Sequence, residues 1–380
     1  MSVARLFRVK SGAVLRRVFG IASAVAIGVT VLFAPAAARV DDQTRDDGAT
    51  GEPPQAQDHR IGPLDALQFA IVGSTRPANL DDLQGYPRAV IGRIWNDIAA
   101  QNPRPSFAIG TGNYMFARRS GSAAQQLDMY LQARAAFSNP FFPAMGNHEC
   151  TGPIGANCGP GAQNGMPESY VQFLQKLLGP IDVAAPYYVV YVTSREGPRV
   201  GGDLEDHGDG HWTAKFVFIA ANAWSSDQAT WLEATMAERT TYTFVVRNEE
   251  SNELAAPGVA PSEQIITRYP FTMRIEGSRG AYAHLSNREI IVGNGGAPLG
   301  PGGAFYGYVV AQRRVDGAIQ FTAYDYSSNA AVDSFAVDAD GSPAPVLPMT
   351  SDQCKNGGWQ TFGVFTNQGD CVSSIVSMGK

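Results

Sequence analysis

Several features that would assign a function directly are missing from this sequence. Beyond residue 17 there is no run of lysine or arginine, and the formal net charge is −6, so no nucleic-acid partner is expected. No Gly-x-Ser-x-Gly motif marks a serine nucleophile, which argues against serine-hydrolase chemistry. Internal repeats and extended low-complexity segments are also absent. What is present is 44% hydrophobic content, enough for one large α/β domain and a small appendage.

Residues 1–38 have the pattern of a secretory signal peptide. Five basic residues, the last two being Arg16 and Arg17, precede an apolar segment from Val18 to Phe33, and alanine-rich cleavage positions follow. The apolar segment has about 16 residues, which is short for a membrane span; an uncleaved anchor is the alternative. Arg16 and Arg17 also resemble a twin-arginine export signal. We therefore expect a secreted or extracytoplasmic protein with no membrane contact after cleavage.

Residues 39–63 have a different character. They are polar, charged and poor in aromatic side chains, so they cannot bury enough apolar surface to offset the entropy of ordering. We predict a disordered linker here. The linker leads into a main domain, residues 64–347, which is followed by a small module, residues 348–380.

The four cysteines fall into two local pairs, Cys150 with Cys158 and Cys354 with Cys371. An even number of cysteines at short spacing in an exported chain favours two disulfides. The second pair closes a segment with too small a core to fold without a covalent link. That segment resembles a short C-terminal cysteine module of exported bacterial proteins, and its partner is unknown. Surface attachment, ligand binding and a purely stabilising role all stay open for it.

The first half of the main domain alternates strands and helices. Short apolar runs at 67–72, 106–109 and 141–145 predict buried strands. The spacing of apolar residues at 86–100 and 123–137 predicts helices. Such β-loop-α repetition is typical of a parallel sheet whose loops share one edge.

The second half contains further apolar strands and two more helices. The expected strands are 187–192, 215–220, 242–247, 289–292, 306–310 and 319–324, and the expected helices are 169–178 and 227–236. Asp227 suits the N-terminal cap of the second of these helices. We predict an α/β sandwich of two mixed β-sheets flanked by helices, with the first half parallel and the second half more antiparallel.

The stretch from Phe141 to Cys150, FFPAMGNHEC, is a candidate site. Its apolar run ends at Gly146, where we expect a turn with positive φ that glycine adopts without strain. Asn147 and His148 then project from the end of a strand, where open α/β sheets place their functional sites. Glu149 is expected to face elsewhere.

Five sequence blocks, in order, resemble those of the calcineurin-like metallophosphoesterases, the superfamily of the purple acid phosphatases. They are the loop that follows strand 67–72, GTGNYMF, PAMGNHE, TYTFVVRNEE and MRIEGSRGAYAHLSNREIIVGNGGAP. The resemblance covers roughly residues 67–326. It implies a metallophosphoesterase-type sandwich for residues 64–347. In that family the blocks hold two divalent metal ions that activate a water molecule against a phosphoester.

Most positions that match the family's metal ligands carry different residues here. The replacements are Ser74 and Arg76 in the first block, Asn113 in the second, Asn248 in the fourth, and Ser278 and Gly280 in the last. Two residues keep the family's identity. The resemblance implies a metal-ligand role for Asn147, if any metal is bound, and a proton-donor role for His148.

These replacements argue against the family's metal centre. Two neighbouring divalent cations need carboxylates and imidazoles to offset their repulsion, whereas amides and hydroxyls are poor ligands for zinc or iron. The permanently cationic Arg76 would repel a metal. We therefore expect no cofactor and a pseudophosphatase, in which His148 is a vestigial proton donor.

The same pocket could bind a small oxyanion such as phosphate. Arg76, Asn113, Asn147 and His148 belong to neighbouring strand ends and offer the donor groups that an oxyanion needs. The alternative is an inert remnant whose polar groups satisfy one another and water.

Two other hypotheses stay open. A working phosphoesterase could hold a weakly bound divalent metal (zinc, iron or manganese) on Asn147 and on groups such as His284 or Asp325. Alternatively, the chain is a structural or adhesive exported protein that acts through its C-terminal module. His284 is also interpretable as a hydrogen-bonded structural histidine.

Two further histidine-containing stretches are given no site. The stretch from Asp203 to His211 gathers four acidic residues and two histidines, but its spacing fits no calcium loop or zinc finger. A solvated loop is the prediction there. His59 lies in the predicted linker and is assigned no role.

Overall fold

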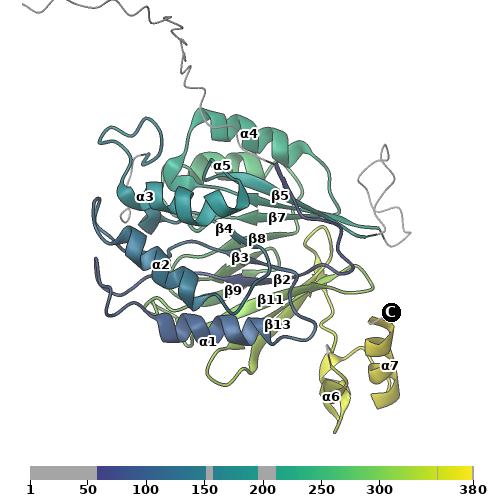
Figure 1. Cartoon of the computed structure of the whole chain (residues 1–380). Coiled ribbons are helices and arrows are strands. Elements are labelled where there is room, and N and C mark those ends of the chain that lie inside the picture. Colours follow the sequence, from purple (N-terminus) through teal and green to yellow (C-terminus); the bar gives the residue numbers. More distant parts are fainter. Residues whose placement is uncertain (1–57, 151–156, 196–210, 349, 379–380) are drawn as a thin grey trace, which may run out of the picture. The chain divides into compact units, whose positions relative to one another are not determined.

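The computed structural model describes residues 58–150, 157–195, 211–348 and 350–378 (Figure 1). All of them belong to one compact unit, Glu52–Lys380. The predicted signal peptide, most of the predicted linker and residues 203–210 of the acidic stretch lie outside the described residues. Among the described helices, none has both the length and the apolarity that crossing a bilayer requires.

The described strands form two mixed sheets of seven strands each. The first sheet has the order β1-β5-β6-β7-β8-β10-β9, and the second has the order β14-β13-β12-β11-β2-β3-β4. The bounds are β1 Asp58–Arg60, β2 Gln68–Val72, β3 Phe107–Gly110, β4 Phe141–Pro143, β5 Tyr188–Thr193, β6 Thr213–Phe218, β7 Tyr242–Val246, β8 Met273–Glu276, β9 Tyr282–Ser286, β10 Glu289–Val292, β11 Gly307–Arg313, β12 Ile319–Asp325, β13 Ala331–Val337 and β14 Pro343–Ala344.

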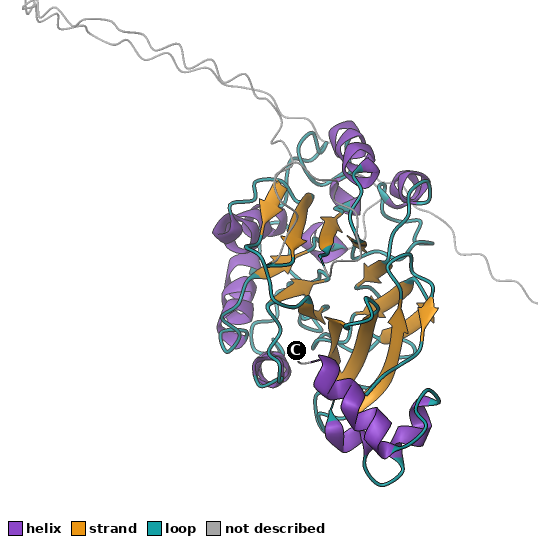
Figure 2. Ribbon diagram, turned by 90° about the vertical axis from the view of Figure 1, so that its right-hand side faces the viewer, coloured by secondary structure: helices purple, strands orange, loops and turns teal. Residues whose placement is uncertain are grey.

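Helices flank the two sheets (Figure 2). The α-helices are α1 Arg88–Ala99, α2 Ala123–Ala133, α3 Glu168–Phe173, α4 Ser226–Ala237, α5 Val259–Ile266, α6 Ser351–Cys354 and α7 Gln368–Met378. Shorter helical turns are η1 Asn147–Cys150, η2 Leu174–Leu178, η3 Gly179–Ile181, η4 Ala221–Ala223 and η5 Gly358–Phe362. The predicted α/β sandwich of two mixed sheets flanked by helices is confirmed.

Aromatic side chains fill the space between the two sheets. Phe69 and Phe107 of the second sheet lie edge-on to Phe216 of the first, with ring centroids 4.9 and 5.2 Å apart. Phe244 extends this cluster at 5.2 Å from Phe69. All four rings are fully buried. Burying one such side chain stabilises a fold by about 1.5–3 kcal/mol, so this cluster is a main source of the attraction between the sheets.

The outer faces of both sheets are covered by helices. Leu232 of α4 and Ile265 of α5 pack with Val217 and Val245 of the first sheet in one apolar cluster. On the second sheet, Trp95 of α1 lies 5.6 Å from the ring of Phe141, centroid to centroid. The central strands are therefore covered on both faces, which explains why they are continuous apolar runs in the sequence.

The second half of the domain is more antiparallel than the first, as predicted, although it contains a parallel segment. β6, β7, β8 and β10 run parallel to one another, whereas β11, β12 and β13 are antiparallel. No strand was predicted at β8, β9, β13 or β14, and no helix at α5, α6 or α7. In β8 the reason is visible, because Arg274 and Glu276 alternate with apolar residues and are buried as partners of other charged groups.

Two predictions about element ends were wrong. The predicted linker extends to residue 63, but Asp58–Arg60 forms β1 and pairs in parallel with β5. His59 thereby packs on Phe142, with ring centroids 5.3 Å apart. Helix α4 is capped by Ser225, whose hydroxyl accepts the backbone N–H of Gln228 at 3.1 Å. Asp227 lies in the first turn of α4 instead of at its cap.

Both predicted disulfides are present, Cys150 with Cys158 and Cys354 with Cys371. The second joins α6 to α7 within the C-terminal module. Both of its cysteines are fully buried there, while most side chains around them are exposed or half-buried. The covalent link is thus a principal element of the module's small core.

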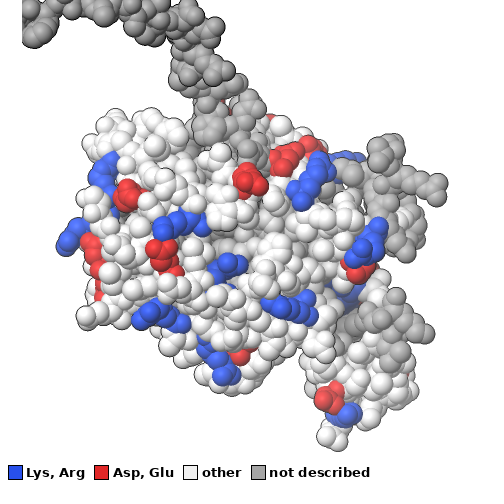
Figure 3. Space-filling view, in the orientation of Figure 1, with Lys and Arg blue, Asp and Glu red and all other residues white. Residues whose placement is uncertain are grey.

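Charged side chains on the surface are mixed in sign. On the face shown in Figure 3, lysines and arginines are interspersed with aspartates and glutamates. Among the described residues, some such charges pair directly, such as Lys176 with Asp128 at 2.5 Å. This face therefore presents no broad field of one sign to a charged polymer.

Five buried or partly buried charged residues form a cluster beside β7, β8 and α5, which we call the charged cluster. The Arg247 guanidinium is fully buried and lies 2.8 Å from Glu263 and 3.4 Å from Glu276. Arg274 contacts Glu263 at 2.5 Å, Glu276 at 3.9 Å and Glu289 at 3.5 Å. The cluster thus has three carboxyls for two guanidinium groups. Burial raises the pKa of Glu276 to about 8, so this carboxyl holds the extra proton at neutral pH.

We expect the free energy of unfolding to fall as the pH rises from about 5 to about 8, because the unfolded chain releases the Glu276 proton near pH 4.3. In this window the folded state binds more protons than the unfolded state. The stabilising contribution of Glu276 is therefore fully present below the pKa of Glu276 in the unfolded chain. This contribution is lost as the pH rises through the pKa of Glu276 in the folded state. The limiting slope for one group is about 1.4 kcal/mol per pH unit. Urea denaturation at four pH values measures it.

The control is a pair of conservative variants. Glu276→Gln should reduce the slope in this window and leave the part contributed by Glu249, since burial raises the pKa of Glu249 to about 7, while Glu253→Gln, at an exposed position, should leave the slope as in the wild type. An unchanged slope in Glu276→Gln would show that another group carries the effect.

Candidate functional site

The candidate site lies where strand ends of the two sheets meet. Loops that follow β2, β3 and β4 of the second sheet and β6, β7, β8 and β10 of the first surround one pocket of about 300 Å³. The described residues that line it are Ser74, Arg76, Asn113, Asn147, His148, Asn222, Asn248, Glu249, Glu253, Ala255, Ala256, Ser278, Arg279, Gly280, Ala297, Pro298 and Gly300. The fold therefore brings together all of the substituted family positions with the retained Asn-His pair.

Hydrogen bonds link the two sheets at this pocket. The Ser74 hydroxyl donates to the carbonyl of Gly277 at 2.7 Å. The Asn248 amide donates to the carbonyl of Thr111 at 2.7 Å, and the Thr111 hydroxyl donates to the carbonyl of Val292 at 2.7 Å. All three side chains are buried. Ser74 and Asn248, at positions where the family places metal ligands, therefore join the loops of one sheet to those of the other.

Gly146 is required for close packing, and the predicted turn with positive φ is wrong. Its backbone is not left-handed. A Cβ atom there would lie 2.4 Å from Asn113 Oδ1 and 2.8 Å from Asn248 Cγ. Asn113 has a left-handed φ of 61°, and its Oδ1 accepts the backbone N–H of His148 at 3.1 Å. Three loops thus approach one another so closely that glycine is needed at their contact.

Glu149 holds two of these loops in place. Its carboxylate is fully buried and accepts backbone N–H groups of Asn113 at 3.0 Å, Tyr114 at 2.9 Å and Gly146 at 2.7 Å. Burial raises the pKa of Glu149, and the three N–H donors oppose that rise. No role was predicted for this residue from the sequence, yet it organises the pocket wall behind Asn113.

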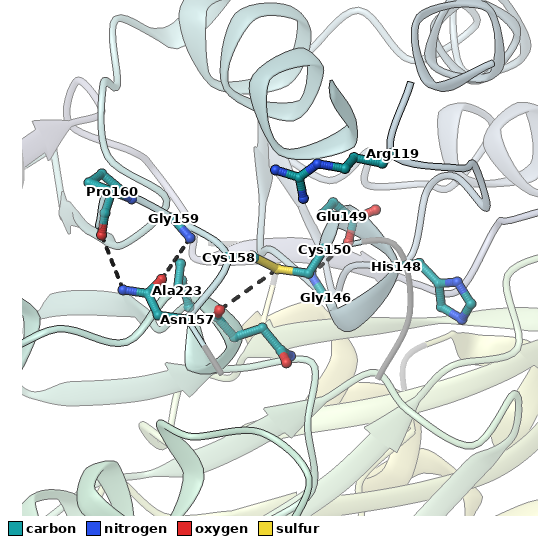
Figure 4. Close-up of a disulfide and its surroundings, with 12 residues drawn as sticks. Arg119, Gly146, His148, Glu149, Cys150, Asn157, Cys158, Gly159, Pro160 and Ala223 are labelled. Atoms are coloured by element: carbon teal, nitrogen blue, oxygen red, sulfur yellow. Dashed lines mark hydrogen bonds between the residues drawn. A yellow bond between two sulfur atoms is a disulfide. The ribbon is translucent and has the colours of Figure 1, made fainter. Parts of the chain in front are cut away.

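His148 is a neutral imidazole on the pocket wall. Burial and the neighbouring charge of Arg76 lower its pKa to about 3. The ring lies edge-on to Phe116, with centroids 4.6 Å apart. Figure 4 shows the side chain leaving η1 on the side away from the Cys150–Cys158 disulfide. With this pKa, His148 has no imidazolium proton to donate at neutral pH.

Arg76 supplies positive charge to the pocket. Its half-buried guanidinium lies 5.2 Å from the centre of the Phe116 ring and donates to the carbonyl of Pro77 at 3.0 Å. Burial lowers the pKa of Arg76, and the charge of Glu149 raises it; an arginine stays cationic under both influences. Within the described part of the chain it forms no salt bridge. Its charge is therefore available to a ligand.

Acidic residues after β7 also line the pocket, and the sequence analysis missed them. Glu249 is buried, and its Oε1 accepts the amide of Asn222. Burial raises the pKa of Glu249 to about 7. Glu253 lies farther out and is exposed. The sequence carries a signal for them, because Arg-Asn-Glu-Glu directly follows an apolar strand in FVVRNEE, although only Asn248 was predicted to belong to the site.

Glu250 has a different part in the same loop. It pairs with Arg279 and accepts the hydroxyl of Ser278 at 2.8 Å. Both partners line the pocket. The charge of Arg279 is thus already matched by a carboxylate, in contrast to that of Arg76.

The side chains of the pocket do not fit a binuclear divalent metal centre. The hydroxyls of Ser74 and Ser278 donate to other protein groups, and Asn113 Oδ1 is occupied by the backbone of His148. Arg76 adds a cation. Across the described residues, no group of three or more histidine, cysteine, aspartate or glutamate side chains is placed to hold a metal.

The two residues considered as displaced ligands lie elsewhere. His284 of β9 stacks on Phe335, with ring centroids 3.7 Å apart, and faces Asp333. Asp325 accepts hydrogen bonds from Ser327 and Ser328 in an exposed turn. Neither His284 nor Asp325 lines the pocket. The structure therefore does not bring His284 or Asp325 to Asn147 in this pocket.

Comparisons with known proteins give no family by sequence. No protein-family model matches the chain, and no curated protein sequence matches it. Among solved structures, it is similar to a purple acid phosphatase from seeds of yellow lupin (Lupinus luteus), with 13% identity and a TM-score of 0.46 over 78% of this chain. The chain spans 58% of the length of that phosphatase.

Two other solved structures show a similar arrangement. One is GAP50, the anchor in the inner membrane complex of Plasmodium, with 14% identity and a TM-score of 0.48 over 80% of this chain and 96% of that one. The other is a 5'-nucleotidase from Candida albicans, with 8% identity and a TM-score of 0.36 over 84% of this chain and 58% of that one. At these identities and TM-scores, the likenesses assign no activity or ligand to this chain.

Proposed function

We propose that this chain is an exported protein of metallophosphoesterase fold whose pocket binds a small oxyanion such as phosphate and no longer hydrolyses phosphoesters with bound metals. The observation that carries the proposal is Arg76. It stands where the resembled family places a metal-binding histidine, and no described carboxylate pairs with it. A guanidinium offers two parallel N–H donors to a phosphate. The two disulfides are compatible with export.

The loss of hydrolysis follows from the side chains around Arg76. Asn113 and Asn147 are neutral amides, and His148 is neutral because its pKa is about 3. None of these groups replaces the charge of two divalent metals, and an imidazole without its proton cannot act as a general acid at neutral pH. The pocket is therefore suited to binding and lacks the groups that drive the family's reaction.

Calorimetry with inorganic phosphate tests the binding. The purified mature protein is expected to bind phosphate with a Kd of about 1 mM or lower. Arg76→Ala should weaken binding at least about tenfold, because a hydrogen bond to a charged group contributes about 1.5–3 kcal/mol. The matched control is Arg118→Ala, which removes an exposed arginine that pairs with Asp81 outside the pocket. No heat from wild-type protein at millimolar phosphate contradicts the proposal.

A hydrolysis assay tests the second half of the proposal. The protein is incubated with a chromogenic phosphomonoester in added zinc, manganese and iron, and its metal content is measured. We expect no turnover and no stoichiometric tight metal. Turnover that disappears in His148→Ala would instead establish a working phosphoesterase.

A further inference from the structure

Four buried polar atoms without a hydrogen-bond partner belong to residues of this one pocket. They are His148 Nδ1, Asn222 Oδ1, Asn248 Oδ1 and Glu249 Oε2. Buried polar atoms in folded proteins are nearly always paired, so such a group at a pocket indicates a ligand or ordered water. Three of the four are oxygens: the two amide oxygens only accept hydrogen bonds, and Glu249 Oε2 only accepts them when its carboxyl is charged. The missing partner of these three oxygens must therefore carry N–H or O–H donors.

The charges that line the pocket divide between the two sheets. Arg76 follows β2 of the second sheet, and Glu249 and Glu253 follow β7 of the first. None of the three forms a salt bridge with any other described residue. Arg279, the remaining charged residue of the described lining, already pairs with Glu250. The pocket thus offers an unpaired cation on the β2 side and unpaired carboxyls on the β7 side.

We infer that the ligand is a small zwitterion, in which a phosphate or phosphonate group bound at Arg76 is joined by a short chain to a primary ammonium group bound at Asn222 and Glu249. The inference rests on the proposed oxyanion site. An ammonium has three donors and no acceptor, which matches the acceptor oxygens of Asn222 and Glu249. A hydroxyl would bring one donor and no charge, so it would leave the carboxyls unmatched. The volume of about 300 Å³ lies at the small end of ligand sites.

The state of Glu249 gives the inference a second readout. Burial raises its pKa to about 7, so at neutral pH about half of these carboxyls carry a proton. An ammonium placed beside Glu249 favours the charged carboxylate. Binding should then release protons from the protein at pH 7, whereas an uncharged ligand of the same shape should release none from Glu249.

The experiment compares two probes by calorimetry at pH 7, phosphoethanolamine and ethyl phosphate, which differ in the ammonium group. Phosphoethanolamine should bind at least about tenfold more tightly, as expected for one added charge-assisted contact. Its binding enthalpy should depend on the ionisation enthalpy of the buffer, which reports the released proton. Glu249→Gln should remove both differences between the two probes.

The variants separate the two proposals. Glu249→Gln keeps an oxygen that can accept the Asn222 amide. Glu253→Gln changes an exposed carboxyl. A partial loss of the preference for phosphoethanolamine in Glu253→Gln can therefore be measured even if Glu249→Gln folds poorly. Equal affinities of the two probes for wild-type protein, with Arg76-dependent phosphate binding intact, overturn the ammonium site alone. Failure of both probes and of inorganic phosphate to bind overturns the proposed oxyanion site as well. An equal loss of affinity for both probes in Glu249→Gln would assign Glu249 a structural role only and would also reject the inference.

Discussion

Replacing Arg247 by methionine is expected to lower the free energy of unfolding by about 3–5 kcal/mol, because the three carboxyls of the charged cluster then share the single guanidinium of Arg274. The guanidinium is fully buried and lies between Glu263 and Glu276. It also donates to the hydroxyl of Ser262 at 2.8 Å and to the carbonyl of Glu249 at 2.8 Å. Methionine fills similar volume but satisfies none of these four groups. The variant should therefore lose stability and also loosen the loop that carries Glu249 into the pocket.

Urea denaturation followed by tryptophan fluorescence measures the change. Arg268→Met is the matched control, since Arg268 is largely exposed and pairs with Glu233 on the surface; such pairs contribute about 0–1 kcal/mol. Arg247→Lys should fall between, because lysine keeps the charge but lacks the planar set of donors. A loss in Arg247→Met no larger than in the control would mean that the charged cluster rearranges or admits water.

The sequence predicted the arrangement of the pocket better than its chemistry. Ser74, Asn113 and Asn147 each follow a strand of the parallel part of the second sheet, and a parallel sheet brings such loops to one edge. Apolar runs and the order of blocks were therefore sufficient to place them. Which groups each side chain contacts depends on the opposite sheet, as with the hydrogen bond from Ser74 to Gly277. No local pattern contains that information.

The missed residues have a common physical reason. Glu149, Glu249 and Glu276 are buried carboxyls, whereas a glutamate in a sequence indicates an exposed position by default. Each is buried because particular partners satisfy it: backbone N–H groups for Glu149, an asparagine amide for Glu249 and arginines for Glu276. These partners are 3 to 36 residues away in sequence for Glu149 and 27 for Glu249; of the two arginines beside Glu276, Arg247 is 29 residues away and Arg274 lies on the same strand. Sequence reasoning from local composition therefore assigns such residues to the surface.

The second large effect is expected at Glu149. Replacing it by leucine removes the acceptor of three buried backbone N–H groups, those of Asn113, Tyr114 and Gly146. Each unsatisfied buried donor costs about 1–3 kcal/mol, so the free energy of unfolding should fall by about 3 kcal/mol or more. Glu149→Gln should lose less, because one of its two terminal atoms is still an oxygen acceptor. The order wild type, glutamine, leucine is the expected result of urea denaturation.

The order of these variants distinguishes hydrogen bonding from packing at this position. If shape alone mattered, glutamine and leucine would both retain most of the stability, since all three side chains have similar volumes. If the acceptors matter, the loops of Asn113 and Gly146 separate in the leucine variant, and phosphate binding that depends on Arg76 weakens with them. Glu168→Leu is the control, because this glutamate has a single side-chain partner, Gln172, on the surface of α3. A loss at Glu149→Leu equal to that at Glu168→Leu would show that the carboxylate does not organise the pocket.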